Sequence, residues 1–380
     1  MADSPSGPLA GCRFVEMAGI GPAPFAAMVL ADLGAQGIRI ESPRPGLTLG
    51  DPLRDITRRG RASVVVDVRQ DGGRDLVLDV VAQSHILIEG FRPGVMERLG
   101  LGPEPCLARR PSLVYGRMTG WGQDGPWART AGHDIDYIAV AGVLAHIARR
   151  GEPPTPPLNL VGDYGGGAML LLVGVLSALW HAERTGQGQV VDAAMVDGAA
   201  LLMSMFHSMS AIGLWQEEAG INLLDSGAPF YDAYRTSDGR WLAIGCLEPQ
   251  FYAEWLRISG LDGDDLPAQF DVAGWPVLRE RFASVVATRT RDEWAALADG
   301  TDACIAPVLT MSEAPHHSHL SARDTFVEVD GLLQAAPAPR FSRTPTGAPG
   351  SVLPSDCDAL RAWGIDEERI SALAAASVIA

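Results

Sequence analysis

Hydrophobic and polar positions follow two different periods in the first third of the chain. Helical spacing of apolar positions, every three to four residues, marks residues 25–33 and 73–83. Short apolar runs typical of buried strands lie at residues 13–17, 37–40, 63–68, 86–89 and 113–118. Strands that alternate with helices indicate an α/β fold with a parallel, doubly wound sheet. We therefore predict a Rossmann-like large domain in this part of the chain.

The middle and the end of the chain have different patterns. Helical periodicity dominates residues 134–146, 165–184 and 192–213. After about residue 230, Asp238-Gly239 separates two strand-like runs and predicts a β-hairpin. The tail is rich in proline as far as Pro354 and ends in a predicted helix over 366–376. A smaller α+β domain from about 230 to 315 follows from this change of pattern.

Composition narrows the choice of function. The chain has 380 residues, of which 47% are hydrophobic and 20% charged, so we expect a globular protein of two domains. Its formal net charge of −16 argues against nucleic acids and anionic membranes as partners. It contains no lysine, and all 30 basic residues are arginine. Pyridoxal-phosphate enzymes and Walker A nucleotide-binding proteins are thereby excluded, because both need a lysine.

Targeting signals and cysteine usage predict the compartment. The first residues show neither the basic nor the apolar region of a secretory signal, and the longest apolar run, 168–180, is shorter than the ~20 residues that span a bilayer. The five cysteines are far apart, odd in number and without a C-x-x-C pair. They predict neither a disulfide framework nor a zinc site. We expect a cytoplasmic protein without membrane insertion.

Two arrangements suggest binding of anions or nucleotides. In an acidic protein an anionic ligand needs a local basic patch, and six arginines lie close together in sequence: Arg54, Arg58, Arg59, Arg61, Arg69 and Arg74. A solvated loop is the alternative. The segment Gly19-Ile20-Gly21-Pro22 follows a predicted strand and imitates a dinucleotide fingerprint. Prolines stand where backbone N–H groups should face a pyrophosphate, so a NAD-dependent dehydrogenase is only a distant alternative.

A histidine cluster invites a metal interpretation. His316, His317 and His319 lie in a proline-containing loop, and no carboxylate pattern completes a metal shell. We therefore favour a surface loop and predict no metal site.

Two polar residues stand directly before predicted helices. His133 does so in Gly132-His133-Asp134, where the helix dipole keeps imidazole neutral and free N–H groups can hold an oxyanion. Asp163 stands beside a run of three glycines and is well placed to be an N-cap. Glycines weaken a helix, so the run indicates close approach of something to the backbone, for example a ligand. Each residue taken alone has an ordinary structural explanation.

Taken together, these motifs resemble the family III CoA-transferase (CaiB/BaiF) superfamily and, within it, the α-methylacyl-CoA racemases. The resemblance extends over nearly the whole chain and includes Glu89-Gly90-Phe91-Arg92-Pro93-Gly94 and Gly245-Cys246-Leu247-Glu248-Pro249-Gln250. It implies an interlocked homodimer and a role in lipid and fatty acid metabolism. It also implies no cofactor beyond the CoA moiety of the substrate. The implied organisation is a Rossmann-like CoA-binding domain over 1–195, a linker over 196–230, a small α+β domain over 231–315, a linker over 316–340 and a segment over 341–380 that returns to the large domain.

The resemblance also implies a reaction. It is the racemisation or epimerisation of 2-methylacyl-CoA thioesters by two-base 1,1-proton transfer through an enolate. His133 and Asp163 form the acid/base pair, Glu248 orients His133, and the backbone N–H of Asp134 holds the enolate oxygen. The alternative is a CoA-transferase in which Asp163 is a nucleophile that forms an acyl anhydride. The racemase is favoured because transferases of the superfamily keep the aspartate, whereas racemases add the histidine and the glutamate. A non-catalytic acyl-CoA-binding protein is a third hypothesis.

The substrate contacts implied by the resemblance fall into two groups. CoA is expected to contact Arg39, Val66, Asp67, Val68, Arg69, Gly90, Phe91, Arg92, Arg98, Gly132 and Tyr137. The acyl group is expected to contact Ile20, Pro24, Met195, Met203, Met205, Met209 and Leu224. The methionines have core packing as an equally good explanation. Family members often carry an arginine where this chain has Ser42, so Arg39 or Arg44 is expected to substitute for it.

Overall fold

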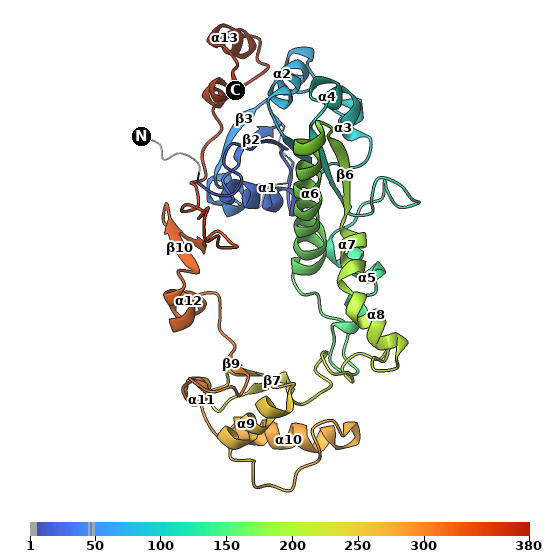
Figure 1. Ribbon diagram of the computed structural model, residues 1–380, viewed down its shortest axis with the longest axis vertical. Helices are drawn as coiled ribbons and strands as arrows, with labels where there is room; N and C mark the ends of the chain where they lie inside the picture. The colour runs from blue at the N-terminus through green and yellow to red at the C-terminus, as the bar shows by residue number, and fades with distance from the viewer. Residues whose placement is uncertain (1–5, 45, 48–49) are drawn as a thin grey trace. The chain divides into compact units, whose positions relative to one another are not determined.

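The computed structural model describes residues 6–44, 46–47 and 50–380 of the chain (Figure 1). These residues form two compact units, each with its own hydrophobic core. The first unit comprises Met1–Ala141, Leu158–Leu202 and Ser321–Ala380, and the second comprises Gly142–Pro157 and Met203–Leu320. The second unit therefore takes in a segment, Gly142–Pro157, that we had assigned to the large domain.

A parallel sheet of six strands forms the centre of the first unit. Its strand order is β3-β2-β1-β4-β5-β6, and every neighbouring pair is parallel. The strands are β1 (Arg13–Met17), β2 (Gln36–Glu41), β3 (Arg61–Val65), β4 (Ile86–Glu89), β5 (Val114–Thr119) and β6 (Gln189–Ala194). This order confirms the predicted α/β class and parallel sheet. The sixth strand corrects the helix predicted from residue 192, because the Gln189–Ala194 segment pairs with β5 along an edge of the sheet.

Helices cover both faces of this sheet. On one face, α1 and α6 pack against alternate strand residues such as Phe14, Ile86 and Val114. On the other face, α2, α4 and the C-terminal helices pack against the intervening residues, such as Val15, Leu87 and Tyr115. The helical segments of the unit are α1 (Pro22–Asp32), η1 (Pro52–Arg54), η2 (Ile56–Arg58), α2 (Asp71–Ala82), α3 (Val95–Arg98), α4 (Pro103–Arg109), α5 (Asp134–Val140), η4 (Leu160–Met169), α6 (Leu170–Thr185), α7 (Met195–Leu202), η7 (Cys357–Trp363) and α13 (Glu367–Ala375).

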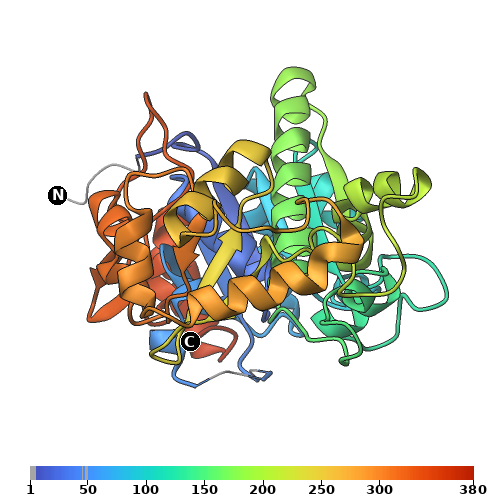
Figure 2. The same ribbon diagram turned by 90° about the horizontal axis from the view of Figure 1, so that it is seen from below.

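The second unit is built on a small antiparallel sheet, seen in yellow and orange in Figures 1 and 2. The strands β7 (Tyr231–Arg235), β8 (Trp241–Gly245) and β9 (Ile305–Pro307) pair in that order. The turn at Asp238-Gly239 joins β7 to β8 and confirms the predicted hairpin. The helical segments are η3 (Leu144–His146), α8 (Ser204–Ala211), α9 (Pro249–Ser259), η5 (Val272–Gly274), α10 (Trp275–Val286), α11 (Arg291–Ala298) and η6 (Ala314–His316).

Regular structure occupies both predicted linkers. Residues 196–230 contain most of α7 and all of α8, which replace the single long helix predicted over 192–213. Residues 316–340 contain α12 (Ser318–Ala322) and a hairpin of β10 (Phe326–Val329) with β11 (Leu332–Ala335). Arg59 reaches this hairpin through Gln334 Oε1 at 2.6 Å and Ala335 O at 2.9 Å.

One continuous helical segment, Leu160–Thr185, is long and apolar enough to cross a membrane by length and composition. It exceeds the 168–180 run seen in the sequence because η4 continues directly into α6. One face of α6 packs in the core against the sheet through Leu171, Leu172 and Val175. Core helices of folded proteins can have the same length and composition, and this packing accounts for the apolar residues of the buried face.

Candidate functional site

The candidate site lies at the carboxyl ends of the central strands. The strand order reverses between β1 and β4, and ligands of open α/β sheets bind in the crevice at such a point. The loop after β4 touches the start of α1 there, because a Cβ built on Gly90 would lie 3.2 Å from Ala23 Cβ. The residues predicted to be catalytic in the first unit follow β5 and precede α6.

His133 is the N-cap of α5 and is exposed. Its backbone N–H donates to Asp136 Oδ2 at 2.9 Å. In a capping box, this is the bond that the third helical residue accepts from the N-cap backbone. The backbone N–H of Asp134, the first helical residue, has no acceptor among the described residues. This donor is therefore free to hold a developing oxyanion, as predicted from helix chemistry. Tyr137 supports the turn by donating its hydroxyl proton to Gly132 O.

Asp163 lies one turn inside η4, a π-helical segment. Its backbone N–H donates to Asp134 Oδ2 at 2.7 Å, which joins the two predicted catalytic segments. Asn159 donates from Nδ2 to Asp163 Oδ2 at 3.1 Å. A Cβ built on Gly21 would lie 3.4 Å from the same oxygen, so the turn after β1 borders this carboxylate. Wide helical turns of this kind are frequent at functional sites.

Burial raises the pKa of Asp163. The nearby carboxylate of Asp134 raises it further, whereas the Asn159 amide and the charge of His133 lower it. His133 and Asp163 are thus close enough to influence each other electrostatically. A raised pKa is what an aspartate needs if it is to donate a proton in one half of a reaction and accept one in the other half.

Two substitutions should shift the pH dependence of activity in opposite directions. Asp134→Asn removes the like charge and lowers the pKa of Asp163, so the acid limb of kcat/KM moves to lower pH. Asn159→Ala removes the donor that stabilises the Asp163 carboxylate, so the acid limb moves to higher pH. The measurement is the pH profile of α-proton exchange for the two variants and the wild type. Acid limbs that coincide in all three proteins would contradict this account.

The glycines beside Asp163 serve the packing of helices. Asp163 is not the N-cap that we predicted, because the helical segment begins earlier and Asn159 holds the N-cap position. A Cβ built on Gly198 of α7 would lie 1.8 Å from Gly166 O, so two helix backbones are in contact. The close approach inferred from the glycine run is therefore made at Gly166 by α7.

Of the arginines predicted to hold anions, some form ion pairs within the protein and others are exposed to solvent. Arg39 is buried and forms an ion pair with Glu16, so its guanidinium is engaged within the protein. Arg69, Arg92 and Arg98 are exposed, and no carboxylate among the described residues pairs with them. These three are therefore the available cations of the predicted CoA-binding set.

The basic patch predicted over residues 54–74 is mostly neutralised. Arg58 pairs with Glu41, Arg59 with Asp32, Arg61 with Glu16 and Arg74 with Asp71 and Asp75. The partners of Arg58, Arg59 and Arg61 are distant in sequence and are brought to them by folding, whereas those of Arg74 are neighbours on α2. Only Arg54 and Arg69 of the six have no carboxylate partner among the described residues.

The predicted contact segment 66–69 is joined to the end of the chain. Val66 is buried and its N–H donates to Glu41 O at 2.8 Å, while the N–H of Asp67 donates to Val378 O at 2.8 Å. Asp67 Oδ1 accepts the N–H of Arg69 at 3.2 Å. Val68 is half-buried against the core. These backbone groups are engaged, so Arg69 offers the free donors of this segment.

The remaining predicted site residues are divided between the units. Glu248 is the exposed N-cap of α9 in the second unit. Of the predicted acyl contacts, Ile20, Pro24 and Met195 belong to the first unit, and Met203, Met205, Met209 and Leu224 belong to the second. Met195 and Met203 are buried, as core packing requires, whereas Met205 and Ile20 are about half exposed.

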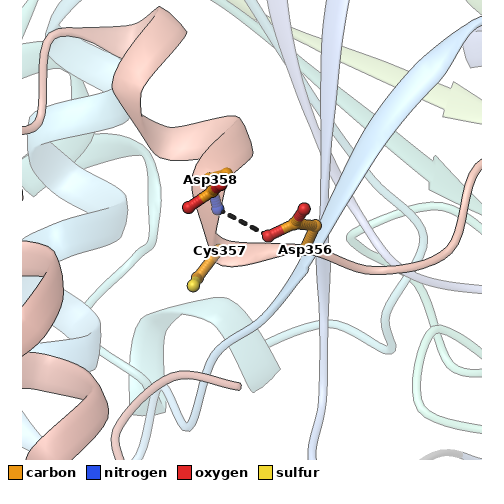
Figure 3. A group of neighbouring side chains, drawn as sticks. All are labelled: Asp356, Cys357 and Asp358. Carbon is orange, nitrogen blue, oxygen red and sulfur yellow. Dashed lines mark hydrogen bonds between the residues drawn. The ribbon is translucent and has the colours of Figure 1, made fainter.

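The side-chain cluster that most resembles a metal site is explained by a helix N-cap. Within the described parts of the chain, the group with ligand atoms close enough to share an ion is Asp356, Cys357 and Asp358 (Figure 3). Asp356 caps η7 by accepting the N–H of Asp358 at 2.8 Å. Asp358 pairs with Arg361 at 2.8 Å. His316, His317 and His319 do not belong to this group.

Sequence reasoning missed two features of the site. Asn159 stands four residues before Asp163, a one-turn spacing that could have suggested their contact. The carboxylate of Asp134, predicted only for its backbone N–H, accepts from a residue 29 positions further along the chain. No local sequence pattern signals such a contact.

Comparisons with known proteins agree with this fold. The sequence model described as CoA-transferase family III matches residues 9–355. The α-methylacyl-CoA racemase of Mus musculus is 44% identical over 368 residues, covering 95% of each chain. That of Homo sapiens is 44% identical over 340 residues, covering 89% of this chain and 87% of its own. A CaiB/BaiF family protein from Brucella suis, 24% identical, has the same fold with a TM-score of 0.80 over 94% of this chain and 99% of its own. The predicted membership is confirmed: the chain belongs to CoA-transferase family III.

Proposed function

We propose that this protein racemises 2-methylacyl-CoA thioesters. The observation that carries the proposal is the hydrogen bond from Asp163 N to Asp134 Oδ2, which fixes one acid/base residue beside the helix start that bears the other, His133. The 44% identity to curated racemases supports an isomerase.

The reaction is a 1,1-proton transfer through an enolate. His133 removes the α-proton of the S-epimer, and the electron pair of the broken C–H bond moves onto the thioester oxygen. The free N–H of Asp134 stabilises that oxygen, and one such donor is typically worth about 10²–10³-fold in rate. Asp163 then donates its proton to the opposite face of the α-carbon as the carbonyl re-forms. In the reverse direction Asp163 is the base and His133 the acid.

We also propose how a dimer and the exposed arginines complete this site. In a homodimer, Glu248 of one subunit would orient His133 of the other. The exposed guanidiniums of Arg69, Arg92 and Arg98 suit CoA phosphates, because the guanidinium fork pairs bidentately with them. No cofactor takes part in this chemistry apart from the CoA of the substrate. We place the enzyme in the cytoplasm and in fatty acid metabolism.

The alternative is CoA transfer through an acyl anhydride on Asp163. A nucleophilic aspartate must be ionised, and burial and Asp134 both raise the pKa of Asp163 and so disfavour the carboxylate. Acid/base chemistry tolerates this environment better than nucleophilic attack does. A raised pKa suits the racemase, which needs Asp163 protonated in one direction of the reaction and ionised in the other.

The deciding experiment is turnover of each epimer of a 2-methylacyl-CoA in D₂O, with a free carboxylic acid present as CoA acceptor. Mass spectrometry measures deuterium at the α-carbon, and chiral analysis measures the epimer ratio. A racemase gives deuterated product and convergence of both epimers to one mixture. Transfer of CoA to the free acid without deuterium would reject the racemase and make Asp163 a nucleophile.

A further inference from the structure

A buried ion cluster lies beneath the loop that follows β4. Glu89, the last residue of this strand, is fully buried and stands opposite Arg117 of β5 in the strand register. Arg117 donates from Nε to Glu89 Oε1 at 2.9 Å and from Nη1 to Glu97 Oε1 of α3 at 2.8 Å. The second oxygen of Glu89 accepts the backbone N–H of Phe91 at 2.7 Å. One carboxylate therefore ties the loop to the neighbouring strand.

The loop held in this way borders the candidate site. A Cβ added to Gly90 would lie 3.2 Å from Ala23 Cβ, so Gly90 faces the start of α1. Arg92 is exposed. The pKa of Tyr137 is raised to about 12, chiefly by burial, and the positive charge of Arg92 opposes this rise. The loop thus contacts the start of α1 and carries a charge close enough to act on Tyr137 of α5.

We propose that Glu89 is a positioning residue for CoA, which fixes the backbone of Gly90 to Arg92 in the conformation that receives the ligand. This inference rests on the proposed function, because it takes CoA as the ligand of the loop. Glu89 does not touch the substrate; it acts through the Phe91 N–H and through Arg117.

The two acceptors of Glu89 explain why a carboxylate stands here. Burying a carboxylate is costly unless it is paired and hydrogen-bonded, and burial raises the pKa of Glu89 to about 7. Its two oxygens face two donors, Phe91 N–H and Arg117 Nε. A glutamine offers one acceptor and one donor group, so it cannot satisfy both. Only the carboxylate holds the loop and the arginine at once.

Glu89→Gln in the full-length protein tests this role. The readouts are the Kd of CoA by isothermal titration calorimetry and the KM and kcat of α-proton exchange. We expect Kd and KM to rise on the order of ten- to a hundredfold, as for loss of a hydrogen bond to a charged group, while kcat changes far less. Asp79→Asn is the matched control, because Asp79 also joins two arginines, Arg109 and Arg369, but lies on α2 and holds no loop.

A rise in KM and Kd that the control lacks supports the proposal. Unchanged Kd and KM, or a fall in kcat alone, would overturn it, even with a lower melting temperature. If E89Q does not fold, Glu89→Asp replaces it. This variant keeps the charge on a side chain shorter by one methylene, and the same rise in Kd and KM is expected. Because CoA binding is measured apart from turnover, a wild type that exchanges no α-proton rejects the racemase while the comparison of Kd values still decides the role of Glu89.

Discussion

His133→Ala is expected to lower the rate of racemisation by about 10²–10⁴-fold, the usual contribution of a positioned acid/base group. The S-epimer loses its base, and the enolate formed from the R-epimer loses its proton donor on the opposite face. Any residual exchange should be confined to the R-epimer, through Asp163, and should retain configuration. The measurement is deuterium incorporation from each epimer separately, with chiral analysis of the product.

The side chain of His133 is exposed, so the substitution should leave the fold intact. His181→Ala, at an exposed histidine of α6, is the matched control and should retain wild-type racemisation. Asp163→Asn should disable the enzyme under both proposed mechanisms, whereas loss of His133 should disable only a racemase. CoA transfer to a free acid at an undiminished rate in the His133 variant would contradict the two-base mechanism.

The sheet was predictable wherever its strands are buried on both faces. The apolar runs predicted at 13–17 and 86–89 coincide with β1 and β4, because central parallel strands carry few polar residues. The edge strand β6 was partly assigned to a helix. Its outer residues, such as Val190, are exposed, so its sequence lacks the continuous apolar signal.

The residues of the candidate site were predictable in type but not in pairing. His133, Asp134 and Asp163 were predicted from local motifs and from the family resemblance, and the structure brings these three together. Whether an arginine is available for a ligand depends on contacts between strands. Arg39 is neutralised because the sheet register places it opposite Glu16, whereas Arg92 lies in a loop and stays exposed. Periodicity and composition carry no information about that register.

Glu16→Ala is expected to destabilise the first unit strongly. Glu16 is fully buried between the guanidiniums of Arg39 and Arg61, with Arg61 Nε 2.9 Å from Glu16 Oε2. The substitution leaves Arg61 without a carboxylate partner among the residues that the structure describes. Removal of one partner from a buried ion pair typically costs about 3–5 kcal/mol, because the remaining charge is uncompensated. The measurement is the free energy of unfolding from urea denaturation, followed by a signal from the first unit.

The consequence should extend to the site, because the same arginines hold the turn that borders Asp163. Arg39 donates to Gly19 O at 3.2 Å and Arg61 to Pro24 O at 3.3 Å. The double variant Glu16→Leu/Arg61→Met should recover part of the lost stability, since apolar replacements of a buried pair are often neutral. Glu367→Ala, which breaks an exposed pair with Arg361 in the first unit, should leave the unfolding free energy nearly unchanged. A Glu16→Ala protein as stable as the Glu367→Ala control would show that the buried cluster adds nothing to the fold, and the turn at 19–24 would then need another support.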